Sequence, residues 1–260
     1  MNFERFYFTQ QSLKAFESCP LKFKKRYIEN IYWGEPPEEN VRRHMQLGKD
    51  FHLLAQRYFM GIPMEDTEAA LQSEQLKKWY NSLKRSFPLD RNTVYLPECK
   101  LKLNSGRGCL EANFDLLAVK DGQITIWDWK TGSSQNNAEN SLRNRKLRGS
   151  LQTMVYLFVL KELGYLITGE SMDCEKLRMC YWQPEPAAVI TEVIYSDDLH
   201  EAFFTTLFDR IEVIRQYDYS TFDKSLYVRD CKYCEFNCFC NNEKVDYEAV
   251  YTEDFLYTDL

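Results

Sequence analysis

The chain has 260 residues, of which 44% are hydrophobic and 15% aromatic, and its formal net charge is −6. This length and composition can bury a substantial core, which excludes an intrinsically disordered chain and a peptide that needs disulfides to fold. No apolar run is long enough to span a membrane, and the first ten residues lack a signal-peptide pattern. We therefore expect a cytoplasmic protein that contacts no membrane.

The negative charge is concentrated in a C-terminal tail. Residues 241–260 hold six acidic residues and one lysine, which leaves residues 1–240 with a net charge of −1. Basic residues gather at 22–26 and 143–148, where they could follow the phosphates of a nucleic acid or form solvated helix faces. The acidic tail could contact a protein partner.

The first third of the chain predicts helices. The segment 12–30 has apolar residues at helical spacing and is interrupted by Pro20, which predicts two short helices that meet at Cys19 and Pro20. Further helices are expected over 41–58 and 67–85.

From Val94 the apolar pattern changes to a period of two. It predicts strands over 95–103, 110–119 and 123–128. Asp121 and Gly122 are typical of a tight hairpin turn between the last two strands.

The remaining elements alternate between helices and strands. A strong helix is expected over 147–163, ended by Gly164. Two strands over 177–183 and 188–195 and a long helix over 198–217 follow. This order indicates an α/β or α+β core.

Two aspartates end neighbouring strands of the predicted hairpin. Asp115 precedes Asp128 by thirteen residues, and Lys130 follows two residues later. Antiparallel strands can bring the two carboxylates side by side, which is costly unless a cation neutralises them, and a hard divalent ion suits such a site. Lys130 would point to the same face as Asp128 and supply positive charge for phosphodiester hydrolysis. A surface ion pair at a strand end is the competing interpretation.

Three further polar residues could reach a cleft shared with these two carboxylates. His52 lies on a predicted helix, and Gln152 and Tyr156 lie one helical turn apart on a later one. His52 would be an additional metal ligand, while Gln152 and Tyr156 would contact the substrate strand or the ligands. Each could instead be a packed residue of its helix.

The order and separations of these motifs resemble the RecB-like branch of the PD-(D/E)XK nucleases, which includes the AddB nuclease domain and the CRISPR-adaptation exonucleases. The matching residues are Gly48, Phe51, His52, Asp115, Asp128, Trp129, Lys130, Thr131, Gly132, Gln152 and Tyr156. The chain departs from the family before the first aspartate, where a small residue is common but Glu111 to Phe114 stand here. This departure concerns the shape of the neighbouring substrate channel.

The resemblance implies roles for these residues. His52, Asp115 and Asp128 would bind Mg²⁺ or Mn²⁺ together with the Trp129 carbonyl, and Lys130 would orient or activate the attacking water. Gln152 and Tyr156 would assist in positioning the substrate. Glu98 fits the position of an accessory acidic residue.

A cysteine cluster near the C-terminus has metal-binding spacing. Cys231, Cys234 and Cys240 follow the pattern C-x2-C-x5-C, with Cys238 between them. In a reducing compartment such a cluster indicates a metal rather than disulfides. The fourth ligand could be Cys238, which would complete a local zinc site, or a distant cysteine.

The N-terminal segment resembles the first helix of iron–sulfur-containing RecB-like nucleases through Phe16-x-x-Cys19-Pro20. The resemblance implies that Cys19, Cys231, Cys234 and Cys240 hold a 4Fe–4S cluster that acts as a structural clamp. Cys238 would then not be a ligand, and zinc remains the alternative. We expect the other cysteines to be small core residues: Cys99, Cys109, Cys174 and Cys180.

The resemblance also implies the fold. We expect an α/β, restriction-endonuclease-like central mixed β-sheet flanked by helices, with the N-terminal helices and the C-terminal cysteine-rich segment clamped together. Residues 1–260 would form a single nuclease domain. Its expected parts are a mainly helical region over 1–93, a core over 94–217, a cluster segment over 218–242 and the acidic tail over 243–260.

The implied function is that of a metal-dependent DNA exonuclease. It would act on single-stranded DNA ends in DNA repair, recombination or CRISPR adaptation. The alternative is a catalytically silent iron–sulfur subunit that binds DNA or supports an assembly. A redox protein would explain the cysteines but leave Asp115, Asp128, Lys130 and Gln152 without a role.

Overall fold

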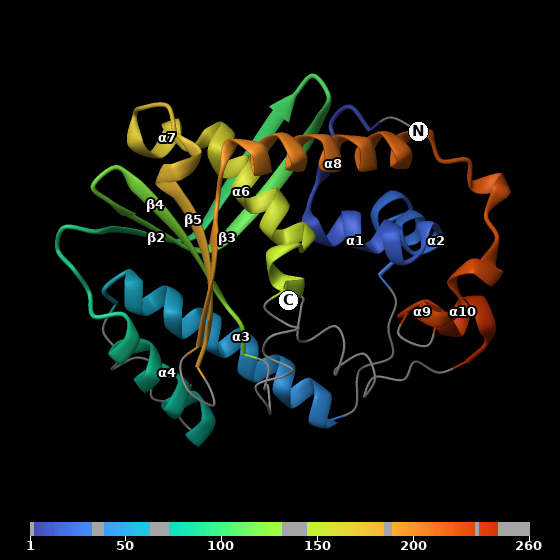
Figure 1. Ribbon diagram of the computed structural model, residues 1–260. Helices are drawn as coiled ribbons and strands as arrows, with labels where there is room; N and C mark the ends of the chain where they lie inside the picture. Colours follow the sequence, from blue (N-terminus) through green and yellow to red (C-terminus); the bar gives the residue numbers. More distant parts are fainter. Residues whose placement is uncertain are drawn as a thin grey trace.

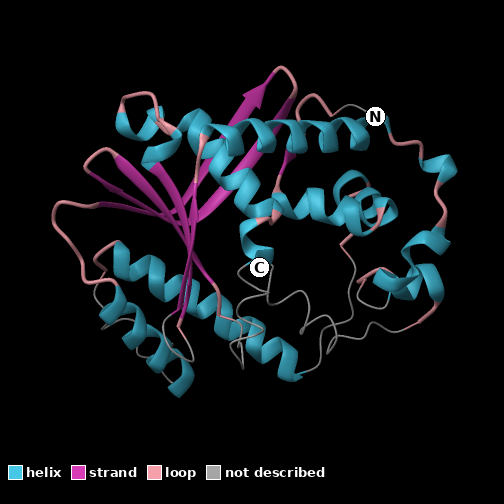
Figure 2. Cartoon of the chain, viewed as in Figure 1, coloured by secondary structure: helices cyan, strands magenta, loops and turns pink. Residues whose placement is uncertain are grey.

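The computed structural model describes residues 3–32, 39–62, 73–131, 145–184, 189–231 and 234–243. These residues form a six-stranded mixed sheet with helices on both faces (Figure 1 and Figure 2). The predicted α/β class and the central mixed sheet flanked by helices are confirmed.

The sheet is built around one long strand. The strands are β1 (Tyr7–Phe8), β2 (Val94–Ser105), β3 (Gly108–Lys120), β4 (Gln123–Trp129), β5 (Leu177–Gln183) and β6 (Val189–Ile194). Their order is β1-β3-β4-β5-β6, and β2 pairs with β3. β2 follows nearly the whole length of β3, so β1 and β4 share the other edge of β3. The β1–β3 and β4–β5 pairs are parallel, and the remaining pairs are antiparallel.

The hairpin between β3 and β4 turns where the sequence predicts. Asp121 and Gly122 have φ of 49° and 75°, the left-handed conformation that a two-residue type I′ turn requires at both positions. The turn fixes the register of the two strands that carry Asp115 and Asp128.

The helices follow the predicted order. They are α1 (Gln10–Ser18), α2 (Pro20–Phe23), the π-helical turn η1 (Lys24–Ile28), α3 (Glu39–Phe59), α4 (Glu74–Ser86), α6 (Leu151–Leu163), α7 (Tyr165–Thr168) and α8 (Asp197–Gln216). Short turns and helices complete the chain: η4 (Cys174–Lys176), η5 (Tyr219–Thr221), η6 (Lys224–Tyr227), α9 (Val228–Cys231) and α10 (Asn237–Asn241). Thr9 and Ser12 form a reciprocal capping box that starts α1.

Each face of the sheet has its own core. On one face, α1, α6 and α8 pack around residues such as Phe114, Leu157 and Phe208. On the other, α3 and α4 pack around Phe51 and Trp182. Within the described residues, no helix combines the length and apolar character that crossing a membrane requires.

Of the two predicted boundaries of the helix over 147–163, the start is wrong and the end is confirmed. The expected helix is divided: residues 145–148 form a separate helical turn, and α6 begins at Leu151, where the Ser150 hydroxyl accepts the Thr153 N–H and caps a new helix. Gly164 follows the last residue of α6, as predicted; its φ is −60°, and the chain continues directly into α7. The left-handed cap belongs to Gly169, with φ of 80°.

Some predictions lie outside the described residues. They are the first part of the 67–85 helix, the polar loop over 133–140 and the acidic tail beyond residue 243.

The C-terminal segment returns to the N-terminal helices. Glu235 forms ion pairs with Lys22 at 3.1 Å and Arg26 at 3.4 Å, and the rings of Phe16 and Tyr217 meet edge to face at 5.3 Å. Lys22 and Arg26 of the basic N-terminal cluster therefore face the cysteine-rich segment.

Candidate metal and catalytic site

The two predicted catalytic aspartates lie where β3 and β4 separate. The antiparallel ladder ends at the pair Leu116–Trp127, one residue short of bringing Asp115 opposite Asp128. Asp115 Oδ2 instead accepts the Trp129 N–H at 2.8 Å. Both carboxylates are buried, Asp115 at 7% exposure and Asp128 at 0%.

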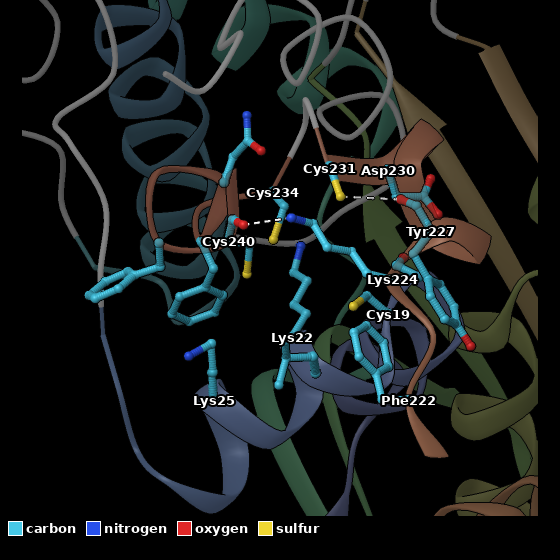
Figure 3. A pocket seen from close by; sticks show the side chains of 15 residues that line it. Cys19, Lys22, Lys25, Phe222, Lys224, Tyr227, Asp230, Cys231, Cys234 and Cys240 are labelled. Carbon is cyan, nitrogen blue, oxygen red and sulfur yellow. Dashed lines mark hydrogen bonds between the residues drawn. The ribbon is translucent and has the colours of Figure 1, made fainter. Parts of the chain in front are cut away.

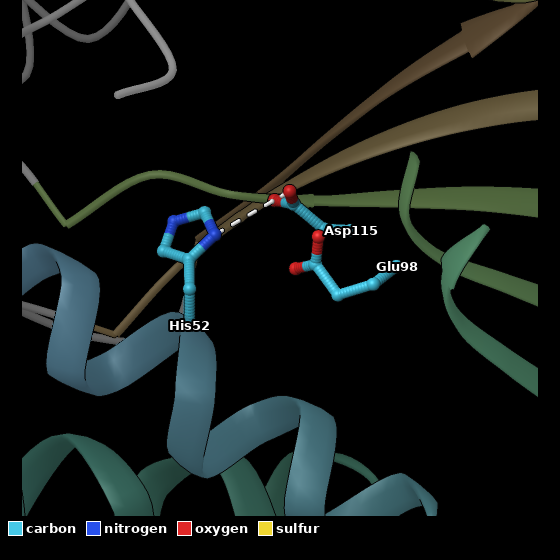
Figure 4. A group of neighbouring side chains, drawn as sticks. All are labelled: His52, Glu98 and Asp115. Carbon is cyan, nitrogen blue, oxygen red and sulfur yellow. Dashed lines mark ion pairs between the residues drawn. The ribbon is translucent and has the colours of Figure 1, made fainter. Parts of the chain in front are cut away.

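A compact group of metal-binding donors surrounds Asp115. His52 of α3, Glu98 of β2 and Asp115 point toward one another, and one ligand atom from each lies within 4.8 Å of the others (Figure 4). His52 Nδ1 is 3.4 Å from Asp115 Oδ1. One imidazole and two carboxylates can hold a divalent cation such as Mn²⁺ or Mg²⁺. The structure thus brings together two predicted ligands, His52 and Asp115, with the accessory acid Glu98.

Glu98 reaches this group through a strained backbone. It lies between the cross-strand pairs Pro97–Leu116 and Cys99–Phe114, directly opposite Asp115. Its φ of 51° is left-handed, which costs a residue of this type on the order of 1–3 kcal/mol and is typical of functional sites. The Asn113 amide donates to Glu98 Oε2 at 3.4 Å.

The surroundings of Asp115 favour its ionised form. Burial, the largest influence, raises the pKa of Asp115. The charge and hydrogen bond of His52, the Trp129 N–H and the charge of Lys130 together outweigh burial and hold this pKa below its usual value. The carboxylate is therefore ready to bind a cation.

Asp128 belongs to a second buried group. Gln152 Nε2 of α6 donates to Asp128 Oδ1 at 2.6 Å, Lys130 Nζ lies 2.8 Å from Asp128 Oδ2, and Lys130 Nζ donates to Gln152 Oε1 at 3.1 Å. Lys130 and Gln152 are each 5% exposed. The sequence prediction placed these three residues in one cleft, and the structure brings them into contact. The roles of Asp128 and the Trp129 carbonyl as metal ligands stay predictions.

Tyr156 borders the same space from α6. Its hydroxyl accepts a hydrogen bond from Gln10 Nε2 at 3.4 Å, and its ring meets Phe114 edge to face at 4.9 Å. A cavity of about 460 Å³ opens here between α1, α3 and the sheet. His52, Glu98, Asp115, Trp129, Lys130 and Tyr156 all line it.

The sequence prediction missed several polar residues of this cavity. Gln10 and Gln11 contribute from α1, Asn113 from β3, and Lys49 and Gln56 from α3. The spacing of Lys49, His52 and Gln56 places them on one face of α3, a signal that could have found two of them. The part played by Gln10 depends on the packing of α1 against α6, which the local sequence does not show.

Comparison with known proteins identifies the family. A model of the PD-(D/E)XK nuclease superfamily matches residues 7–241. The chain belongs to the PD-(D/E)XK nuclease superfamily. A crystal structure of a candidate exonuclease from Eubacterium rectale is similar with a TM-score of 0.50 and 10% identity, over 81% of this chain and 80% of that chain.

A second crystal structure, of SSO0001, has a TM-score of 0.42 and 13% identity over 93% of this chain and 89% of that chain. At 10% identity the likeness to the Eubacterium rectale protein concerns the fold. No curated protein matches the chain.

A second cavity of this PD-(D/E)XK protein gathers four cysteines. Cys19, Cys231, Cys234 and Cys240 line a cavity of about 310 Å³ between the N-terminal helices and the C-terminal segment (Figure 3). Cys238 is not among the lining residues, and its thiol donates to the Glu235 carbonyl at 3.9 Å. The structure brings together the predicted four cysteines, which are 212 residues apart between Cys19 and Cys231.

Burial and three lysines act in opposite directions on the thiol pKa values of this cavity. Burial raises the pKa of Cys234 to about 12, an effect that Lys22 opposes. Lys22, Lys25 and Lys224 line the cavity, and Lys224 Nζ donates to the Cys240 carbonyl at 2.6 Å. A cofactor that binds four thiolates would replace the protons that burial otherwise retains, and the three ammonium groups would offset its negative charge.

Proposed function

We propose that this chain is a divalent-metal-dependent deoxyribonuclease of the RecB-like branch, acting as an exonuclease on single-stranded DNA ends. The observation that carries the proposal is a single cavity lined by His52, Glu98, Asp115 and Lys130, in which the Lys130 ammonium is also ion-paired with the buried Asp128 carboxylate. The resemblance to RecB-like nucleases supports a role in DNA repair, recombination or CRISPR adaptation.

The residues of the cavity would have different roles in phosphodiester hydrolysis. His52, Glu98 and Asp115 would hold the cation, with Asp128 and the Trp129 carbonyl as further ligands; a bound cation polarises the phosphate and lowers the pKa of a water. Gln152 fixes Lys130 and Asp128 relative to each other. The Lys130 ammonium would orient the attacking water and stabilise the negative charge that develops on the phosphate.

The burial of the site supports a single-stranded substrate. Lys130 is 5% exposed and Asp115 7%, so a phosphodiester must enter the cavity between α1 and α3 to reach them. A single strand is narrower and more flexible than a duplex, so it enters such a cavity more readily.

The decisive test is cleavage of end-labelled single- and double-stranded DNA by anaerobically purified protein in Mn²⁺, Mg²⁺ or chelator, beside Lys130→Ala. We expect metal-dependent degradation of the single strand, lost by at least about 10²-fold in the variant. The product ladder reports the polarity of digestion. DNA binding without cleavage by folded protein would contradict catalysis and favour a silent binding or assembly subunit.

We further infer that Cys19, Cys231, Cys234 and Cys240 hold a 4Fe–4S cluster. The set of lining cysteines supports a cluster, because it unites Cys19 with Cys231, Cys234 and Cys240, as the resemblance implies, and leaves out Cys238, which a local zinc site would use. Iron and acid-labile sulfide after anaerobic purification are the expected readings. Stoichiometric zinc without sulfide would contradict the cluster.

A further inference from the structure

The face of the β2–β3 hairpin that carries Asp115 continues beyond the catalytic cavity as a row of polar side chains. Glu111, Asn113 and Asp115 alternate along β3, while Leu110, Ala112 and Phe114 turn to the opposite face and are fully buried in the core. The sheet therefore presents the first three residues together.

Two lysines of β2 stand opposite these residues. Lys100 pairs across the strands with Asn113, and Lys102 pairs with Glu111. Residues that face each other across an antiparallel pair share one side of the sheet. Starting from Glu98, which lies opposite Asp115, Lys100 and Lys102 are the next two positions on the same side.

Both lysines are held by one carboxylate. Glu111 Oε1 lies 3.4 Å from Lys100 Nζ, and Glu111 Oε2 lies 3.0 Å from Lys102 Nζ. The lysine side chains are 53% and 52% exposed, while Glu111 is 19% exposed and also lines the catalytic cavity. Ion pairs this exposed contribute little to stability, so another anion can compete for the lysines. Lys102 Nζ also lies 4.9 Å from the centre of the Tyr7 ring.

We propose that Lys100 and Lys102 bind successive phosphates of a single DNA strand whose scissile phosphate lies at Asp115. This inference rests on the proposed nuclease function and extends it to the path of the substrate. Alternate residues of a strand are about 6.7 Å apart, comparable with neighbouring phosphates of an extended nucleic-acid strand. The phosphates replace Glu111 as the partner of the two ammonium groups, and Tyr7 offers a ring on which a base stacks.

Glu111 holds the side chains of Lys100 and Lys102 in place when no substrate is bound. Its carboxylate draws both ammonium groups to the side of the sheet that leads into the cavity. Other exposed lysines have a different arrangement: Lys77 pairs with Glu74 at 2.8 Å and Lys176 with Asp173 at 3.3 Å, each within its own turn. Lys77 belongs to α4 and Lys176 to η4, so neither lies on the β2–β3 hairpin that carries Asp115, and the two provide a charge-matched control.

The test measures the salt dependence of binding to an oligothymidylate of about twenty nucleotides, with full-length protein in chelator so that cleavage does not interfere. Each phosphate contact with a single strand contributes about 0.7 to the slope of log K against log salt. We expect Lys100→Ala/Lys102→Ala to lower the slope by about 1.4 and to weaken binding roughly ten- to thirty-fold at 0.1 M salt. Lys77→Ala/Lys176→Ala should leave both unchanged.

Two further readings separate the possible outcomes. Glu111→Gln should tighten binding several-fold, because it frees both ammonium groups. In cleavage assays the Lys100→Ala/Lys102→Ala variant should raise KM and leave kcat unchanged. An unchanged salt slope in the Lys100→Ala/Lys102→Ala variant would overturn only the proposal that these lysines bind phosphates. If the unsubstituted protein did not bind the oligothymidylate at all, the proposed nuclease function would be overturned as well.

Discussion

Gln10 and Tyr156 join the two candidate sites of this protein. Gln10 Nε2 donates to the Tyr156 hydroxyl at 3.4 Å, across 146 residues of sequence, at the border of the catalytic cavity. Gln10 begins α1, and the same helix is C-capped by Cys19, which lines the cysteine cavity. A helix of nine residues thus links the cysteine cavity to the catalytic cavity.

We expect Gln10 and Tyr156 to act as one unit in catalysis. Gln10→Ala and Tyr156→Phe should each lower kcat/KM by roughly three- to ten-fold, since either removes the same hydrogen bond of about 0.5–1.5 kcal/mol. The double variant should be no worse than either single variant, and a double-mutant cycle on kcat/KM measures this coupling. Effects that multiply would show that the two side chains act independently.

Lys130 should stabilise the metal-free protein as well as serve the reaction. It is the cation beside the fully buried Asp128 carboxylate, 2.8 Å away. Removing one partner of a buried ion pair costs about 3–5 kcal/mol, so Lys130→Ala should lower the free energy of unfolding in chelator by about that amount. Urea unfolding provides the measurement.

A second measurement is how a divalent cation changes the free energy of unfolding of Lys130→Ala. Mn²⁺ should restore more stability to Lys130→Ala than to the unsubstituted protein, because a bound cation supplies positive charge near Asp128. Lys100→Ala, which removes a half-exposed pair, should change the free energy of unfolding by less than about 0.5 kcal/mol. A loss below about 1 kcal/mol in Lys130→Ala would contradict the importance of the buried pair.

Cys234 and Cys238 offer a matched pair for testing the proposed cluster. Cys234 lines the cysteine cavity, whereas Cys238 does not, and only three residues separate them. Cys234→Ser should lose iron and acid-labile sulfide and lower the free energy of unfolding by about 4–5 kcal/mol, if the cluster restricts the unfolded chain as a disulfide of similar span does. Cys238→Ser should retain the metal and the stability. The reverse pattern would support a local site that uses Cys238.

Much of the fold follows from local sequence. The period-two pattern and the Asp121–Gly122 turn predict the β3–β4 hairpin because strand alternation and left-handed turn residues act over a few positions. The start of α6 at Leu151 was missed because apolar periodicity continues through Leu147, while the Ser150 hydroxyl captures the helix N-terminus.

The candidate site was predictable only in part. The order of His52, Asp115, Asp128, Lys130 and Gln152 identifies the residue types through the family resemblance. The nearness of Glu98 to Asp115 depends on the β2–β3 register and on the left-handed backbone of Glu98. Neither property is fixed by the residues next to it in the chain, so the sequence could only suggest an accessory role.

Gly164 provides a test of the packing between α6 and α7. A Cβ at this position would lie 2.5 Å from Met172 Cγ and 2.7 Å from the Leu160 carbonyl oxygen. The Met172 side chain is buried and the Leu160 carbonyl is part of a helix, so neither can move away freely. Overpacking of this kind costs about 1–3 kcal/mol, and Gly164→Ala should lower the free energy of unfolding by that amount.

Gly149→Ala is the control for this substitution. Its added Cβ would lie 3.9 Å from the Arg145 carbonyl oxygen, an ordinary contact. Because alanine restricts the unfolded chain more than glycine does, this variant should be unchanged or up to about 1 kcal/mol more stable. Urea unfolding of both variants measures the difference. Equal free energies of unfolding for the two variants would show that Met172 can move away from an added Cβ at position 164, and would contradict overpacking at the α6–α7 junction.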